Sequence, residues 1–480
     1  MCGFCSGGND SILNKPETNL RAQNIRWQSI IKRFVANYGI VRQVRLLLII
    51  IFSFLMAKYS HRNVHLMLCF SFFSGLASAI AQAGLFDTFL YIQSSESNSA
   101  VGLAESISGI TQVLAVLPSG YIADKFSRSA ILRICAGVSV CFVVLSVLGV
   151  YYDSVSLVYS SLVVFGMYSA VESSASFALF SDSLPQGDRA LWMSRVAVWT
   201  QVAMGVGPLV SLVMFYYLGD EWSLSILKKV LVFGFILFIP ANAFLLTWKD
   251  IPPSVYSSSF LAEADHPFLE RLRVQSLAPY LICLNDVITC VGAGMTVKFF
   301  PLFFKNDYGL SPMELQGLFA VNCLSFAIFT WLCERLASRI GRVQGSLLFS
   351  MGGVACLFTL AYVRWLPLVI FVFVLRGALQ NSIYPIDRSI IMDFVPSKER
   401  GRWNSIESLS AMTWSGSAVV GGYLMDNHDY RYTFFITGYI YLIACCMRIP
   451  LLWMVPKREK FVQAKTVFED LSFSPRVFAH

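Results

Sequence analysis

Charged residues are scarce in this sequence. Asp, Glu, Lys and Arg together make up 14% of the 480 residues, whereas apolar residues make up 56%. A soluble domain carries about 25% charged residues, so a soluble globular protein is excluded. Several apolar runs reach ~20 residues, which is long enough to cross a ~30 Å hydrocarbon core. The composition therefore predicts an integral multi-pass membrane protein whose main surroundings are the lipid bilayer.

Other signatures are missing as well. Polar residues run to about position 40, so no signal peptide is expected. The twelve Cys show no metal spacing, and the five His show no nucleophile–base or metal cluster. A phosphate-binding Gly-rich loop with Lys is absent, which argues against ATP-driven pumping. The net charge of +8 comes from Lys and Arg in short loops. We therefore expect no enzyme activity, no cofactor, no metal site and no nucleic-acid partner.

Twelve apolar segments fall into two sets of six. The first set occupies residues 64–248 and the second residues 276–456, and a polar linker joins them at 249–275. Residues 1–63 form a basic extension, in which Leu46 to Ala57 is too short for an ordinary span. An interfacial helix is the expected form of that stretch, with an extra span as the alternative. A polar tail follows at 457–480. Numbered one to twelve, the segments lie near 64–92, 99–122, 130–152, 155–183, 193–218, 230–248, 276–304, 312–333, 343–363, 366–395, 405–425 and 432–455.

A local pattern occurs twice, 211 positions apart. It relates Asp182, Pro185, Asp188, Arg189, Trp192 and Ser194 to Asp393, Pro396, Glu399, Arg400, Trp403 and Ser405. The same register relates Gly166 to Gly377 and Gly205 to Gly416. It places segment four on segment ten and segment five on segment eleven. The chain is thus predicted to be two copies of one unit, an arrangement that in membranes indicates a transporter with its site between the halves.

The loop charges predict the orientation. Fourteen Lys and Arg lie on one side of the membrane, in the loops 125–133, 189–195, 249–273, 335–342 and 398–402. Five lie on the other side, namely Lys228, Lys229, Lys305, Arg364 and Arg431. Positive loops stay on the cytosolic side. We therefore predict that both termini and the linker are cytosolic, in either the plasma membrane or an organellar membrane.

Two of these loops carry a motif. Residues 120–128 read Gly-Tyr-Ile-Ala-Asp-Lys-Phe-Ser-Arg, and residues 338–342 read Ser-Arg-Ile-Gly-Arg. Together with the six-plus-six topology, they resemble the loops of the major facilitator superfamily over about residues 64–456. The resemblance implies an all-α membrane protein made of two pseudo-symmetric six-helix bundles around a central cavity. Ser127 and Ser338 depart from the family pattern, which has Gly and Asp at those positions.

The same motif predicts a cytosolic gate. Gly120 permits close helix approach, and Asp124 can accept hydrogen bonds at a neighbouring helix N-terminus. Lys125 and Arg128 can pair with carboxylates across the cytosolic face. In the second half, Arg339, Gly341 and Arg342 occupy the equivalent loop. The alternative is that these charges only set the topology.

Four ionisable residues are predicted near the middle of the bilayer, where such groups are costly and usually face a cavity or a partner. Glu172 lies ~16 Å deep in segment four, and Asp286 lies ~15 Å deep in segment seven, at ~1.5 Å per residue. Arg376 and Arg388 bracket the same zone in segment ten. Arg376-Gly377 resembles a superfamily motif of segment four, here displaced to the second half. We consider these four as substrate or proton sites, with an Asp286–Arg388 structural ion pair as the alternative.

Three further charges are predicted near the outer face. Asp87 and Lys298 are equivalents in the 211-residue register, so an ion pair across an outer gate is one hypothesis and independent solvated charges are the other. Glu105 is a candidate for the outer vestibule. Phe299, Phe300, Phe303 and Phe304 flank Pro301, which is expected to bend segment seven. We interpret these Phe as packing residues.

These features favour a secondary transporter of a small organic solute that works by alternating access, with proton coupling as an added hypothesis. We expect a monomer. Uncoupled facilitative transport and a non-transporting receptor or scaffold on the same fold remain alternatives. The residues do not name the substrate, because both carboxylates and arginines are predicted in the pocket.

Overall fold

A computed structural model describes residues 62–82, 84–184, 189–250, 277–394 and 400–455. These residues are helical and contain no strand. Nearly all of the predicted basic extension with its interfacial helix, most of the linker and the whole tail lie outside the described residues. The structure therefore bears on the predicted segments and on the loops between them.

Each predicted apolar segment corresponds to a helix or to a broken helix. The first half consists of α3 (Arg62–Ala81) with α4 (Leu85–Gln93), α5 (Asn98–Lys125), α6 (Arg128–Tyr151), α7 (Val155–Asp182), α8 (Arg189–Leu218), and α9 (Leu224–Ala243) with η1 (Phe244–Thr247). The second half consists of α10 (Ala278–Thr296) with η5 (Val297–Phe299) and α11 (Phe300–Tyr308), α12 (Pro312–Ile340), α13 (Arg342–Tyr362), α14 (Leu366–Asn381) with α15 (Tyr384–Phe394), α16 (Arg400–Asn427), and α17 (Tyr430–Arg448) with α18 (Leu451–Met454).

Among the described residues, eleven of these crossings are long and apolar enough to span a membrane. The twelfth, α16, has sufficient length at 28 residues but a more polar sequence. The predicted fold class, an all-α membrane protein of six plus six helices, is confirmed.

Short polar side chains start the helices after the tight connections. Ser97, Ser154 and Asp429 each accept a hydrogen bond from the backbone N–H three residues on, which satisfies a free donor of the first turn. Ser311 forms a full capping box with Glu314 at the start of α12. These caps stabilise the points at which the four helices begin.

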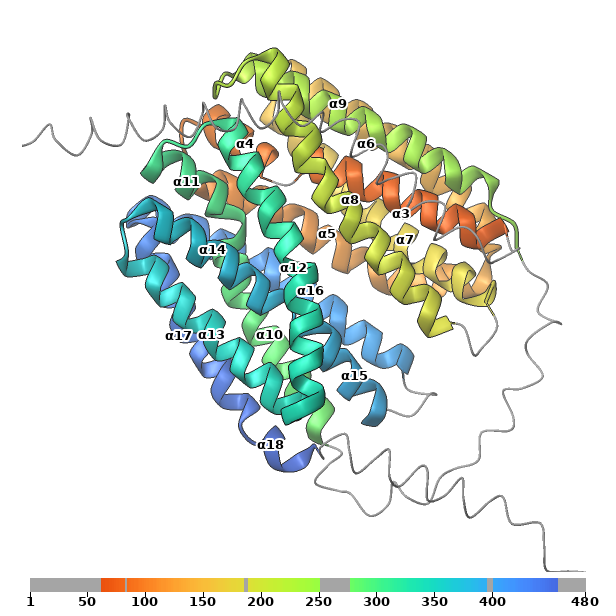
Figure 1. The fold of residues 1–480 in the computed structure, drawn as a ribbon. Coiled ribbons are helices and arrows are strands. Elements are labelled where there is room, and N and C mark those ends of the chain that lie inside the picture. The colour runs from red at the N-terminus through yellow and green to blue at the C-terminus, as the bar shows by residue number, and fades with distance from the viewer. Residues whose placement is uncertain (1–61, 83, 185–188, 251–276, 395–399, 456–480) are drawn as a thin grey trace, which may run out of the picture.

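The two halves lie side by side, as Figure 1 shows in red to yellow-green for the first and in green to blue for the second. The main contacts between them join α5 to α16 and α8 to α12, with a smaller one between α4 and α11. Glycines bring α5 and α16 together: a Cβ on Gly102 would lie 2.3 Å from the carbonyl oxygen of Ala418. Such close backbone approach is typical of helix pairs in membranes.

For orientation, we name the two ends of the molecule by the linker. The linker end is where α5, α7 and α9 finish and α10 begins. The far end is where α4 and α11 finish and where α5 and α12 begin.

Among the described residues, five crossings consist of more than one helical element, and three of their breaks bear on the site. Segment one breaks at Gly84, which has a positive φ of 78°, and segment seven breaks at η5, just before Pro301 as predicted. Segment ten breaks at Ser382–Ile383, two residues before Pro385. Its counterpart α7 runs unbroken from Val155 to Asp182. The break in segment ten is a finding that the hydropathy pattern did not indicate.

Candidate functional site

A cavity of about 630 Å³ lies within the membrane-spanning region. Every residue that lines it belongs to the second half, from α10 to α17. One part of the wall is aromatic and includes Phe300, Phe319, Phe373, Trp414 and Tyr441. The resemblance implied a central cavity flanked by both halves, so the site in this structure is more one-sided than expected.

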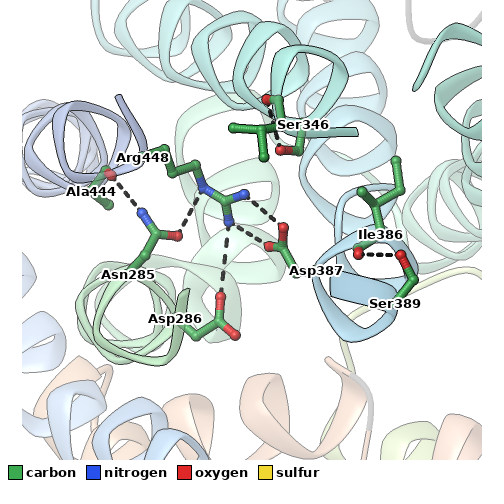
Figure 2. A network of polar contacts seen from close by, with 9 residues as sticks. Asn285, Asp286, Ser346, Ile386, Asp387, Ser389, Ala444 and Arg448 are labelled. Carbon is green, nitrogen blue, oxygen red and sulfur yellow. Dashed lines mark hydrogen bonds and ion pairs between the residues drawn. The ribbon is translucent and has the colours of Figure 1, made fainter. Parts of the chain in front are cut away.

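A buried polar network forms one wall of the cavity (Figure 2). Arg448 on α17 forms a two-pronged ion pair with Asp387 on α15, with N–O distances of 2.9 and 2.6 Å. Its Nε donates to Oδ1 of Asn285 on α10 at 2.9 Å, and Asn285 in turn donates to the Ala444 carbonyl. Asp286 lies 3.9 Å from the same guanidinium. The planar guanidinium meets the carboxylate at two points and so sets the relative rotation of α15 and α17. The hydrogen bond to Asn285 adds α10 to the network.

The break in segment ten explains where this network sits. It creates a helix start at Tyr384, and Asp387 falls in the first turn of α15. A carboxylate at a helix N-terminus is favoured by the helix dipole. A continuous helix would provide no such N-terminus in the middle of a crossing. The broken helix thus accounts for a carboxylate that is only 4% exposed.

Arg376 reaches the same cavity from α14 and is 6% exposed. Its guanidinium carbon lies 4.8 Å from the centre of the Phe300 ring, and Nη2 donates to the Tyr441 hydroxyl at 3.5 Å. Its Nε has no hydrogen-bond partner. Within the described part of the chain, no carboxylate forms an ion pair with Arg376. Phe300, which we expected only to pack, also serves as a cation–π partner.

Arg388 and Asp286, predicted as a pair, also both line the cavity. Arg388 donates to the Tyr384 hydroxyl at 3.1 and 2.6 Å. Asp286 also lies within ion-pair distance of Arg448. The shortest ion pair in the network is a different one, between Arg448 and Asp387, and the Asp286–Arg388 pair stays a prediction.

Glu172 is placed differently from the other three predicted residues. It is not among the residues that line the cavity. It lies in the first half, close to Tyr168 and to Cys135 on α6, and hydrogen-bonds Ser176 one turn further along α7. Its Oε1 is buried without a hydrogen-bond partner. The carboxylates that line this cavity therefore come from the second half alone, whereas Glu172 lies among residues of its own bundle.

The three outer charges come together at the interface between the halves. Lys298 of η5 pairs with Glu105 of α5, with an Nζ–Oε2 distance of 2.9 Å. Asp87 of α4 is 5% exposed and interacts electrostatically with both. Lys298 also lies 5.4 Å from the ring centre of Trp414. Asp87 is thus buried rather than solvated, and the ion pair across the interface uses Glu105 in place of Asp87.

The predicted gate residues lie at the linker end. Gly120, Asp124 and Lys125 are in the last turns of α5, and their side chains lie outside the described part of the structure. Arg128 at the start of α6 pairs with Asp182 at the end of α7. That contact stays within the first half.

In the second half, Gly341 joins α12 to α13 with a φ of 115°, a conformation that glycine adopts readily. Arg342 donates to Ser389 on α15 at 3.3 Å, and Arg339 lies exposed on the last turn of α12. This loop, like the first, makes its described contacts inside its own half.

Asp250 makes a helix-start contact of the kind predicted for Asp124, whose side chain lies outside the described part of the structure. Its carboxylate accepts hydrogen bonds from the Ser127 hydroxyl and from the backbone and hydroxyl of Ser129. Partial burial alone would raise the pKa of Asp250. The hydrogen bonds from these serines, with a smaller contribution from Arg133, outweigh burial and lower the pKa below its ordinary value.

Sequence reasoning missed several members of the site, among them Arg448, Asn285 and Asn322. Arg448 is an arginine inside segment twelve, and that depth was the available signal. Asn322 on α12 lines the cavity, and its Oδ1 is buried without a partner. A single polar residue in an apolar segment carries a weaker signal.

The comparisons with known proteins agree with this architecture. The Major Facilitator Superfamily model matches residues 67–284 and 282–478, so the chain belongs to the major facilitator superfamily. It therefore has a membrane transporter fold and is not an enzyme. No curated protein matches the sequence.

Solved structures show the same fold at low identity. A bacterial homologue of the iron transporter ferroportin, in an inward-facing state, has a TM-score of 0.63 and 12% identity over 83% of this chain and 100% of its own. A bacterial homologue of the human lysosomal transporter Spinster, inward-facing and occupied, has a TM-score of 0.60. It is 14% identical and covers 83% of this chain and 98% of its own. The nucleoside transporter NupG has a TM-score of 0.59 and 14% identity over 82% of this chain and 99% of its own.

Proposed function

We propose that this protein is a secondary transporter of a small organic solute and that it works by alternating access between its two halves. The observation that carries the proposal is a cavity of about 630 Å³ at membrane depth, lined by charged and aromatic side chains. A receptor or scaffold has no need of such a cavity. Transporter sites gather at this depth, next to broken helices.

The contacts between the halves support a specific state. At the far end, Asp426 accepts from the backbone N–H groups of Asn98 and Ser99 at 2.8 Å each. Trp222 donates to the Leu310 carbonyl at 2.8 Å. These contacts cross between the halves. Those described at the linker end, Arg128–Asp182 and Arg342–Ser389, each remain within one half. We infer a conformation closed at the far end.

The positive loop charges support a cytosolic linker end, and with that orientation the proposed conformation is inward-facing. Two of the structural neighbours are named as inward-facing, the homologues of ferroportin and Spinster. In the outward-facing state, the far-end contacts would open and the linker-end charges would meet across the halves. The predicted gate residues would act in that second state.

A disulfide across the halves tests alternating access. A Cβ on Gly205 of α8 would lie 3.6 Å from Cβ of the native Cys323 on α12, within the usual range for a disulfide. We expect Gly205→Cys to abolish solute uptake into proteoliposomes after oxidation and to regain it after reduction. Uptake is measured by mass spectrometry of liposomes exposed to a metabolite extract.

Two matched controls accompany this test. Gly205→Ser adds a similar side chain without a thiol, and Gly205→Cys with Cys323→Ser removes the partner. Both should transport equally under oxidising and reducing conditions. Uptake that continues after the engineered thiol is fully cross-linked to Cys323 would rule out a rocking mechanism and favour a channel-like path.

Proton coupling remains an additional proposal. Glu172 carries a buried carboxyl oxygen without a partner, and Asp286 borders the cavity. We propose that one of them takes up a proton during the cycle. Uptake should lose its dependence on a pH gradient in Glu172→Gln or in Asp286→Asn. An unchanged dependence in both variants would leave facilitative transport as the mechanism.

A further inference from the structure

The guanidinium of Arg376 is buried without a counter-ion among the described residues. The side chain is 6% exposed and lines the cavity. Its contacts are neutral, the Tyr441 hydroxyl and the face of Phe300. Its Nε donates to nothing. Arginine stays protonated under all physiological conditions, so this charge cannot be relieved by loss of a proton.

The surrounding charges leave Arg376 in excess. Three arginines line the cavity, Arg376, Arg388 and Arg448, against two carboxylates, Asp286 and Asp387. The lining therefore carries a formal charge of one positive unit. Asp387 is committed to Arg448 through two short contacts. A buried charge without a partner is unfavourable in a low-dielectric region, so an anion in the cavity would be strongly favoured.

The rest of the wall limits what that anion is. Phe319, Phe373 and Trp414 offer an apolar, aromatic surface beside Arg376. Asn322 presents a buried oxygen that lacks a hydrogen-bond donor, and it lies against Gly377, the residue after Arg376. Beside Arg376, the cavity thus combines one positive charge in excess, the amide of Asn322 and a large apolar face. A single charge in excess matches a monocarboxylate better than a phosphate dianion.

We propose that this cavity binds an organic monocarboxylate with an aromatic or apolar body and that Arg376 holds its carboxylate. The planar guanidinium can meet a carboxylate through two parallel hydrogen bonds, and Nε is free to make one of them. The body of the ligand lies along the aromatic wall. The proposal rests on the proposed function, because it names the class of solute for that site.

Binding to the purified full-length protein tests the idea. The probes are benzoate, 3-phenylpropionate and indole-3-acetate, with benzyl alcohol, benzylammonium and inorganic phosphate for comparison. A ligand that binds the folded state raises the midpoint of thermal unfolding. We expect a saturable rise with at least one carboxylate and none with the alcohol or the ammonium compound. Arg376→Met should lower the binding affinity for that carboxylate at least about tenfold, which corresponds to a loss of ~1.4 kcal/mol or more.

Two variants complete the design. Arg335→Met removes an exposed arginine of α12 that stacks on Trp331, and it should bind as the unaltered protein does. Arg376→Gln replaces Arg376→Met if the latter does not fold. A structural role predicts that the loss of Arg376 lowers the stability of the ligand-free protein, whereas our proposal predicts unchanged or higher stability, since an unpaired charge is removed.

Several outcomes would overturn the proposal. These are no saturable shift with any of the three carboxylates, an equal shift with benzyl alcohol, a shift with phosphate alone, or carboxylate binding that survives the loss of Arg376. The cross-linked Gly205→Cys protein separates this result from the transport result. If the cross-link blocks uptake but no carboxylate binds, the proposed solute class is wrong and the alternating-access mechanism stands. If a carboxylate binds but uptake continues after cross-linking, the alternating-access mechanism is wrong and the proposed solute class stands.

Discussion

Segments four and ten occupy equivalent places in the two halves, and their differences show which part of the fold was kept and which part changed. A Cβ on Gly166 would lie 2.1 Å from Oγ1 of Thr111, and a Cβ on Gly377 would lie 2.5 Å from Oδ1 of Asn322. Thr111 and Asn322 are themselves related by the 211-residue register. Both halves thus use a glycine to admit a polar side chain from the second helix of the bundle.

The preceding residue differs between the halves. Phe165 packs among aromatic rings, 4.8 Å from Phe142 and 6.3 Å from Phe238 between ring centres. Its counterpart Arg376 faces the cavity. The same position of the repeat therefore holds a core aromatic residue in the first half and a charged cavity residue in the second. The two halves thus share this helix packing, whereas the charged residues that line the cavity all belong to the second half.

The largest effect is expected where the second half differs most from the first. Arg448→Leu should destabilise the protein by about 3–5 kcal/mol, because it leaves Asp387 buried without its partner. In the 211-residue register, Arg448 corresponds to Leu237 and Asp387 to Ser176 of the first half. Adding Asp387→Ser to Arg448→Leu should recover most of the loss. Thermal unfolding in one detergent measures both, and a double variant no more stable than the single one would contradict the idea.

The shared glycine contact allows a matched pair of substitutions. Gly166→Ala and Gly377→Ala should each destabilise by about 1–3 kcal/mol through overpacking. Gly166→Ala should be the worse of the two, because its Cβ would also lie 2.5 Å from the backbone oxygen of Ser108. The nearest atoms to Gly377 belong to side chains, which can move. Equal unfolding midpoints would show that the two helix contacts are equally rigid.

The charge cluster between the halves gives a smaller effect. In a double-mutant cycle, Glu105→Gln and Lys298→Met should show a coupling of about 0.5–3 kcal/mol. The cycle of Asp87→Asn with Lys298→Met should show less, because the ion pair of Lys298 uses Glu105. Exchanging the charges as Asp87→Lys with Lys298→Asp should not restore uptake. Restoration would identify Asp87 as the partner during transport.

The smallest effect concerns the two helix starts at the linker end. Asp250 supports α6, whereas α13 starts from Gly341 without a side-chain cap. Asp250→Asn should lower stability by about 0.3–1 kcal/mol, reduced by solvent screening because Asp250 is exposed.

The lowered pKa of Asp250 sets the sign of the pH dependence. Its contribution is present above the ordinary carboxyl pKa and is lost as the pH falls through the lowered value in the folded state. The difference in unfolding midpoint between Asp250→Asn and the unaltered protein should therefore shrink on acidification. A difference independent of pH would contradict this.

Hydropathy and register predicted much of this fold but less of the site. Apolar length set the twelve crossings, and Pro301 marked a real break. Depth along a helix placed Asp286, Arg376 and Arg388 near the cavity. Rotation about the helix axis is decided by packing against neighbours, so Glu172 at a similar depth faces its own bundle. For the same reason the buried arginine beside Asp387 is Arg448, which lies far along the chain from both Asp286 and Asp387.

The broken segment ten has a meaning for protein engineering. Lipid cannot satisfy free backbone groups, and the Ser382 hydroxyl and the Asn381 amide bond the carbonyls of Ala378 and Gly377 at the end of α14. The two polar side chains at the interruption are therefore themselves hydrogen-bonded to the last turn of α14. A redesign that straightened this crossing into an uninterrupted apolar helix would remove the helix start that holds Asp387. It would retain a membrane-spanning scaffold while erasing the polar wall of the cavity.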